Sequence, residues 1–99
     1  MVHYELAVIF RTLGKSDLPA ALRSACGTLL AQGSIVREME SRGERRLPYK
    51  MGAHKERFTH GRYVIFDFDA PPQSVGLILS QIHQNRDVIR ASLVKSESP

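Results

Sequence analysis

The clearest structural signal in this chain is the stretch RYVIFDFD, residues 62–69. Its second half alternates, with Phe66 and Phe68 on one side and Asp67 and Asp69 on the other. Successive side chains of a β-strand point to opposite faces of a sheet. The alternation therefore predicts a strand with one buried face and one wet face.

A helix is predicted directly after this strand. It begins at Pro71-Pro72, and Asn85 is its expected end. Gly76 lowers its intrinsic helix preference by about 1 kcal/mol, so packing must hold it. Its apolar residues recur at intervals of three and four, as a buried helix face requires. They are Val75, Ile78, Leu79 and Ile82.

Another helix is predicted nearer the N-terminus. Ser16 or Asp17 can cap it by accepting a hydrogen bond from a free backbone N–H. Pro19 fits its first turn, where a missing N–H costs little, and Gly33 tolerates the positive φ that ends many helices. The predicted buried stripe comprises Leu18, Ala21, Leu22, Ala25, Leu29 and Leu30.

Three further strands complete the pattern, at residues 4–11, 35–40 and 87–95. Pro48 cannot donate to a central ladder, so the strand that begins at Ile35 should lie at a sheet edge or end at Pro48. Residues 52–57 read as a mobile connection.

The predicted order is strand, helix, strand, strand, helix, strand. Two right-handed strand–helix–strand crossovers place both helices on one face of a four-stranded antiparallel sheet. This is the α+β, ferredoxin-like βαββαβ sandwich. The fold does not state the function, which commonly lies on the open sheet face or on the loops.

Length and composition limit the classes of protein that remain. Ninety-nine residues make one domain, 1–99, with an expected frayed tail at 96–99. One cysteine, Cys26, excludes a disulfide framework. No apolar run approaches the roughly 20 residues needed to cross a bilayer, and the start lacks a secretory signal. We expect a protein of a reducing compartment or of an organelle.

The net charge of +4 comes from one central segment. Residues 42–62 hold seven basic and two acidic residues, a net of +5. A dense cationic patch on a balanced domain points to a polyanion, usually a nucleic acid. The alternative is a solvated, charged loop.

Enzyme sites fit the sequence poorly, and we expect no catalytic residue, metal or cofactor. No two histidines have the helical spacing of zinc-protease ligands. His54 and His60 could form a metal site with an acid only if the fold brought them together, and otherwise they are polar residues of a solvated loop. No base lies near Cys26 in the sequence. Asp67 and Asp69 could form a paired-carboxylate site or simply the wet side of a sheet. An acyl-phosphate hydrolase would need an asparagine near Arg11, which the next residues lack.

The common RNA-binding module of the same topology also fits poorly. Its third strand carries aromatic side chains on which bases stack. In the best alignment, over residues 60–67, Arg62 and Asp67 replace two of these aromatics. Arginines without stacking aromatics suit recognition of phosphate and shape instead.

Four motifs occur along the chain in a set order. They are Tyr4-Glu5-Leu6-Ala7, residues 43–51 (GERRLPYKM), the Gly61-Arg62-Tyr63 step, and Asp87-Val88-Ile89-Arg90 followed by Val94-Lys95. In this order, and in element length, the chain as a whole resembles the bacterial-type small-subunit ribosomal protein six family. The Leu47-Pro48-Tyr49 version of the second motif and the Tyr4-Glu5-Leu6-Ala7 opening look more like mitochondrial members than bacterial ones.

The resemblance implies a structural, non-enzymatic role in the small ribosomal subunit, supporting mitochondrial translation. It implies binding to ribosomal RNA of the central domain, the platform, beside small-subunit ribosomal protein eighteen. No cofactor, membrane or small-molecule substrate is expected. The expected location is the mitochondrial matrix, with the bacterial cytoplasm as the alternative. A stand-alone RNA-binding or regulatory module of this fold is the alternative function.

The expected RNA-binding residues are cations. The resemblance implies Arg45, Arg46, Lys50, Arg62 and Arg90, and charge alone adds Lys55 and Arg57.

The expected protein-partner residues lie on the second predicted strand and the open sheet face. They are Ile35, Arg37, Glu38, Glu40 and Tyr49. Glu38 and Glu40 could meet a basic partner tail, or they could protect a strand edge from aggregation.

Overall fold

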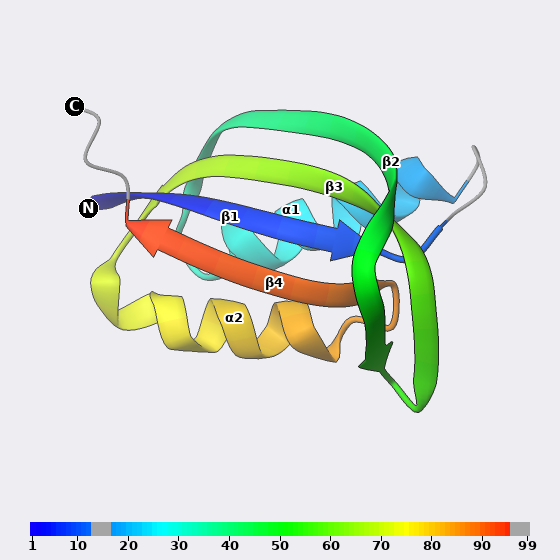
Figure 1. The fold of residues 1–99 in the computed structure, drawn as a ribbon. Helices are drawn as coiled ribbons and strands as arrows, with labels where there is room; N and C mark the ends of the chain where they lie inside the picture. Colours follow the sequence, from blue (N-terminus) through cyan, green and yellow to red (C-terminus); the bar gives the residue numbers. More distant parts are fainter. Residues whose placement is uncertain (13–16, 96–99) are drawn as a thin grey trace.

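The computed structural model describes residues 1–12 and 17–95 and confirms the ferredoxin-like sandwich (Figure 1). The sheet order is β2-β3-β1-β4, and each neighbouring pair is antiparallel. Both helices cover the same sheet face, which leaves the other face open. The elements are β1 (Val2–Phe10), α1 (Leu18–Ala31), β2 (Ile35–Ala53), β3 (Glu56–Ala70), the 3-10 turn η1 (Pro72–Ser74), α2 (Val75–Gln84) and β4 (Val88–Lys95).

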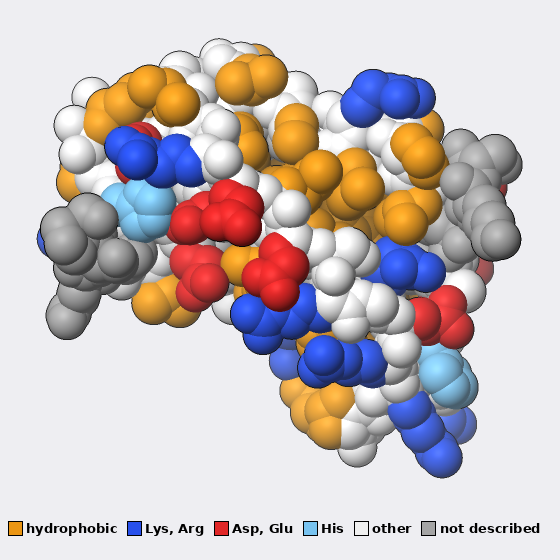
Figure 2. All heavy atoms as spheres, turned by 90° about the horizontal axis from the view of Figure 1, so that it is seen from above, with side chains coloured by type: hydrophobic (Ala, Val, Ile, Leu, Met, Phe, Trp, Pro, Cys, Tyr) orange, Lys and Arg blue, Asp and Glu red, His pale blue; other side chains and the backbone are white. Residues whose placement is uncertain are grey.

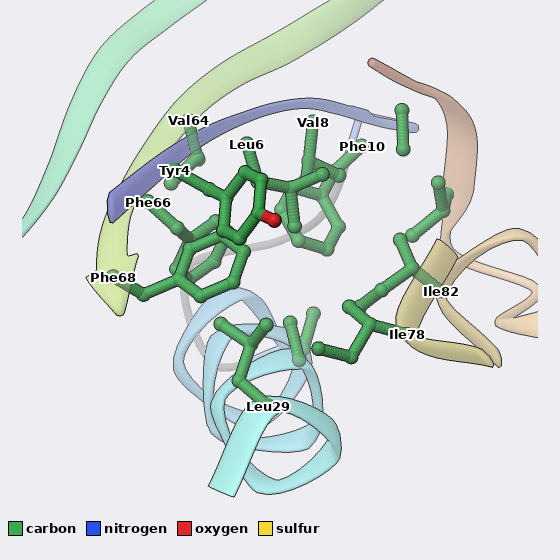
Figure 3. Close-up of a cluster of buried hydrophobic side chains, with 14 of the residues drawn as sticks. Tyr4, Leu6, Val8, Phe10, Leu29, Val64, Phe66, Phe68, Ile78 and Ile82 are labelled. Carbon is green, nitrogen blue, oxygen red and sulfur yellow. The ribbon is translucent and has the colours of Figure 1, made fainter. Parts of the chain in front are cut away.

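The main core lies between the sheet and the helices (Figure 3). Phe66 and Phe68 are fully buried, as the alternation in β3 predicts. From α1, the core takes Ala21, Ala25 and Leu29, which recur every fourth residue. Leu30, predicted as part of this stripe, is 59% exposed. That prediction was wrong, because the residue next to Leu29 points about 100° away around the helix.

The helix ends follow the predictions in part. Pro19 lies in the first turn of α1, and Gly33 has a φ of +80° just after its end. Asp17 occupies the N-cap position, but its side chain makes no capping hydrogen bond. Ser16, the other predicted cap, lies outside the described residues, as does the tail at 96–99. Asn85 ends α2 as predicted.

Strands β2 and β3 are longer than predicted. β2 is an edge strand, as Pro48 indicates, but Pro48 does not end it. The pairing runs from Arg46↔His60 to Met51↔Phe58, so Pro48 sits in a bulge of the edge strand. An edge strand has one side without a ladder, and a bulge leaves residues unpaired, so the missing N–H is tolerated there.

The predicted mobile connection at residues 52–57 was also wrong. β2 and β3 are joined by a tight turn at His54 and Lys55, between the paired residues Ala53 and Glu56. Both turn residues have positive φ, 52° and 66°. This is the backbone geometry of a two-residue hairpin turn whose twist matches that of the strands.

The far end of this hairpin folds over the open face of the sheet (Figure 1). Leu47 and Met51 of β2 pack there against Ile9 of β1 and Ile89 of β4 in a second, smaller core. Gly61 permits this close approach, because a Cβ at that position would lie 2.5 Å from Cγ2 of Ile9. The fold thus places residues 42–62 as a hairpin fastened at its far end.

Candidate nucleic-acid interface

The predicted RNA-binding cations come together on one projecting element, which we call the basic hairpin, residues 42–62. All lie on it except Arg90, which lies on β4. Arg45, Arg46 and Lys50 lie on β2, Lys55 in the turn, and Arg57 and Arg62 on β3.

These cations are largely available to a ligand. All are exposed except Arg62, which is half-buried and whose Nε is enclosed without a hydrogen-bond partner. None of the seven predicted cations forms an ion pair with a carboxylate among the described residues. In the described chain, one residue of the basic hairpin forms an ion pair: Arg42 Nε lies 3.5 Å from Oε1 of Glu40, just before the hairpin.

Two tyrosines hold arginines at this surface. The guanidinium carbon of Arg45 lies 5.6 Å from the ring centre of Tyr63, and that of Arg90 lies 5.7 Å from the ring centre of Tyr49. Arg90 Nη1 also donates a hydrogen bond to the Tyr49 hydroxyl at 2.7 Å. A cation–π contact positions the guanidinium and leaves its charge in place.

The predicted partner residues do not form one set in the structure. Ile35, Glu38 and Glu40 are exposed on the first half of β2. Arg37 lies beside them, but its Nε donates to Asp69 Oδ2 at 2.6 Å. Tyr49 lies apart, against Arg90 beside the basic hairpin.

The open sheet face carries a histidine between two carboxylates, which sequence reasoning missed. His3 Nδ1 lies 2.7 Å from Asp69 Oδ1, and His3 Nε2 lies 2.6 Å from Asp67 Oδ1. The hydrogen bond to Asp69, helped by Asp67, raises the pKa of His3. The hydrogen bonds from His3 and Arg37 lower the pKa of Asp69. The two aspartates are therefore occupied by cations.

The surface divides by charge (Figure 2). Acidic side chains gather beside a histidine on the left half of the view, and basic side chains cover the end that projects at the lower right. The acidic part of the open face holds Glu5, Glu38, Glu40, Asp67 and Asp69. An anionic ligand is attracted to the hairpin end and repelled by this half.

Residues 1–12 and 17–95 were also compared with the requirements of a metal site, a membrane-spanning helix and a reactive cysteine. No group of three or more His, Cys, Asp or Glu side chains there is placed to hold a metal ion. No helix in that part of the chain is long and apolar enough to cross a membrane. Cys26 is half-buried, and burial raises the pKa of its thiol, as for a core residue.

Comparison with known proteins gives the family. The model of the family "Ribosomal protein S6" matches residues 3–95. The chain is 42% identical to the small ribosomal subunit protein bS6m of Bos taurus, covering 96% of this chain and 77% of that one. It is 39% identical to bS6m of Mus musculus, covering 96% and 76%.

A solved structure supports the fold. The crystal structure of 30S ribosomal protein S6 from Thermotoga maritima superposes with a TM-score of 0.82 at 15% identity, covering 96% of this chain and 87% of that one. The family match and the relatives, taken without this structure, confirm the predicted family, non-enzymatic role and mitochondrial location. The chain belongs to the ribosomal protein S6 family, as a mitochondrial structural constituent of the small ribosomal subunit.

Proposed function

We propose that the protein binds small-subunit ribosomal RNA through the basic hairpin and Arg90. The contacts are to backbone phosphates, which arginine forks can grip in a bidentate manner and lysines can meet as point charges. Such contacts fix position but read no base sequence. Specificity then comes from the shape of the RNA and from a neighbouring protein.

The observation that carries this proposal is the lack of internal neutralisation. Seven cations lie on or beside one hairpin, and the carboxylates of the described chain pair with none of them. Like charges so close together repel one another and destabilise the free protein. A polyanion removes this repulsion and releases its own counterions on binding.

We further propose that the bound RNA is that of the central domain, which forms the platform of the small subunit. The neighbouring protein is then small-subunit ribosomal protein eighteen. The resemblance to the family suggests this pair. Ile35, 56% exposed, and the exposed Glu38 and Glu40 line the free edge of the sheet. That edge can take a basic partner segment by strand pairing or by apolar contact.

The RNA contact is tested by the salt dependence of binding to a transcript of the small-subunit ribosomal RNA. Affinity should fall steeply with salt, because each neutralised phosphate releases counterions. The double variant Arg45→Ala/Arg46→Ala should flatten the slope of log affinity against log salt by up to about two units. Arg23→Ala, which removes an exposed arginine on α1, is the control and should leave the slope unchanged.

An unchanged slope in the double variant would mean that the patch is solvated and makes no contact. The stand-alone alternative is tested by sedimentation of mitochondrial lysate. A ribosomal constituent migrates with the small subunit. Recovery of most of the protein free, or with messenger RNA, would favour the separate RNA-binding module.

A further inference from the structure

A hollow of about 440 Å³ lies at the tip of the basic hairpin. We call it the tip pocket, and it is lined by residues from three distant parts of the chain. Arg11 follows the end of β1, Arg86 precedes β4, and the hairpin turn with the first residue of β3 supplies the rest. The lining residues are Arg11, His54, Lys55, Glu56 and Arg86.

The walls of the tip pocket are held in place by hydrogen bonds. His54 Nε2 lies 3.1 Å from the carbonyl oxygen of Val88, so it donates there and ties the turn to the start of β4. Arg11 is fixed to Asp87 three times. Its backbone N–H donates to the Asp87 carbonyl at 2.8 Å, and its Nε and Nη2 lie 2.8 Å and 2.7 Å from Asp87 Oδ1.

The charge of the tip pocket favours an anion. Asp87 offsets Arg11, but Lys55 and Arg86 form no ion pair with a carboxylate of the described residues. Glu56 is the one acidic side chain among the five lining residues. Two unpaired cations that line one hollow, against one carboxylate, leave a positive surplus there.

The tip pocket adjoins a second hollow of about 290 Å³, which is also lined by Arg11 and Glu56. The second hollow adds Arg57 and His60, farther along β3. A ligand that spans both would pass from the hairpin tip along the strand. A polymer with regularly spaced anions fits this path better than a single small anion does.

We propose that the tip pocket binds a backbone phosphate of the ribosomal RNA, with Arg86 and Lys55 as the contacting cations and Arg11 as part of the wall. This inference rests on the proposed function and extends it to Arg86, outside the basic hairpin. A planar guanidinium can meet two phosphate oxygens at once. Glu56 opposes the phosphate and limits its affinity.

The test measures binding of the full chain to the small-subunit ribosomal RNA transcript over a range of salt concentrations. Arg86→Gln removes one cation and should reduce the salt slope by up to about one unit. Glu56→Gln removes the opposing charge and should tighten binding at low salt. Arg23→Gln on α1 is the matched control and should bind like the wild type.

The outcomes separate this inference from the proposed function. If Arg45→Ala/Arg46→Ala flattens the slope but Arg86→Gln and Glu56→Gln change nothing, the tip pocket makes no contact and the inference is wrong. If none of these variants changes binding, the proposed function fails as well. Inorganic phosphate, added at the same concentration as the RNA transcript, should not displace the RNA. Displacement would identify a small-anion site and overturn the inference.

Discussion

His3 lies between two carboxylates on the open face of the sheet. Each ring nitrogen lies within hydrogen-bond distance of a carboxylate oxygen, from Asp69 and from Asp67. A carboxylate can only accept, so the two hydrogen bonds form together when both ring nitrogens carry protons. Arg37 also binds Asp69, so this group of four links β1, β3 and β2.

This group of four side chains, which we call the clamp, makes the free energy of unfolding depend on pH. In the unfolded chain, His3 titrates near its ordinary pKa of 6.5, and in the fold its pKa is raised. The stabilisation is therefore complete below about pH 6.5 and is lost as the pH rises through the raised pKa. We expect the urea midpoint of the wild type to fall more between about pH 6 and pH 9 than that of His3→Gln. Parallel profiles of the two proteins would show that His3 does not supply this dependence.

The clamp was only half visible in the sequence. The alternation in residues 62–69 put Asp67 and Asp69 on one face, and it left open a paired-carboxylate site or a plain wet face. The missing fact was the register His3↔Asp69 between β1 and β3. Their hydrogen bond joins residues 66 positions apart, and local patterns carry no information on such pairing.

The basic hairpin is the element that sequence reasoning described least well. Pro48 correctly indicated an edge strand, although the strand does not end there, whereas the run 52–57 was misread as a loop. The bulge absorbs Pro48 on an edge strand, and the turn places His54 and Lys55 at positive φ. Burial of Leu47 and Met51 against Ile9 outweighs these local preferences.

Gly61 sets how closely the hairpin lies on the sheet. In Gly61→Ala, the new Cβ would meet Cγ2 of Ile9 at 2.5 Å and the Phe10 carbonyl oxygen at 3.1 Å. The backbone atom cannot move cheaply, so we expect a loss of about 1–3 kcal/mol in the free energy of unfolding, measured in urea. Gly76→Ala in α2 has nothing within 4 Å of the new Cβ and should be neutral or stabilising by at most about 1 kcal/mol. Equal free energies of unfolding for the two variants would contradict the role of Gly61 in the close approach of the hairpin to the sheet.

For the main core, by contrast, periodicity was sufficient. The strict alternation in β3 and the three- and four-residue spacing in α2 each predicted the buried side chains Phe66, Phe68, Ile78 and Ile82. These patterns depend only on the geometry of one strand or one helix. The second core could not be predicted in this way, because it joins residues of three strands through the bend of the hairpin.

At the scale of the whole molecule, the fold separates two charges that lie close together in the sequence. Glu38 and Glu40 precede the basic hairpin by only a few residues, yet they lie in the acidic part of the open face. Glu40 pairs only with Arg42 at the start of the hairpin, and neither acid pairs with the seven predicted cations. Charge counting could identify the cationic segment. It could not find Arg86, which lies far away in sequence and joins the hairpin only through the turn.

This separation predicts that the protein and RNA contacts can be broken independently. Glu38→Lys/Glu40→Lys reverses the charge at the free edge and should weaken binding to small-subunit ribosomal protein eighteen on the order of tenfold or more, measured by calorimetry. The neutral pair Glu38→Gln/Glu40→Gln should weaken it less. The salt slope of RNA binding should stay as steep as in the wild type. If calorimetry gave the same affinity for the charge-reversed variant as for the wild type, the acidic edge would not be part of the partner site.

The second core is small, and four buried side chains hold down the far end of the hairpin. Local opening there costs less than global unfolding, so the turn with Lys55 is a natural first point of cleavage in a copy without RNA. RNA on the tip pocket would cover that turn. Assembly would then shield the protein from proteases, and surplus copies left outside the ribosome would be degraded first.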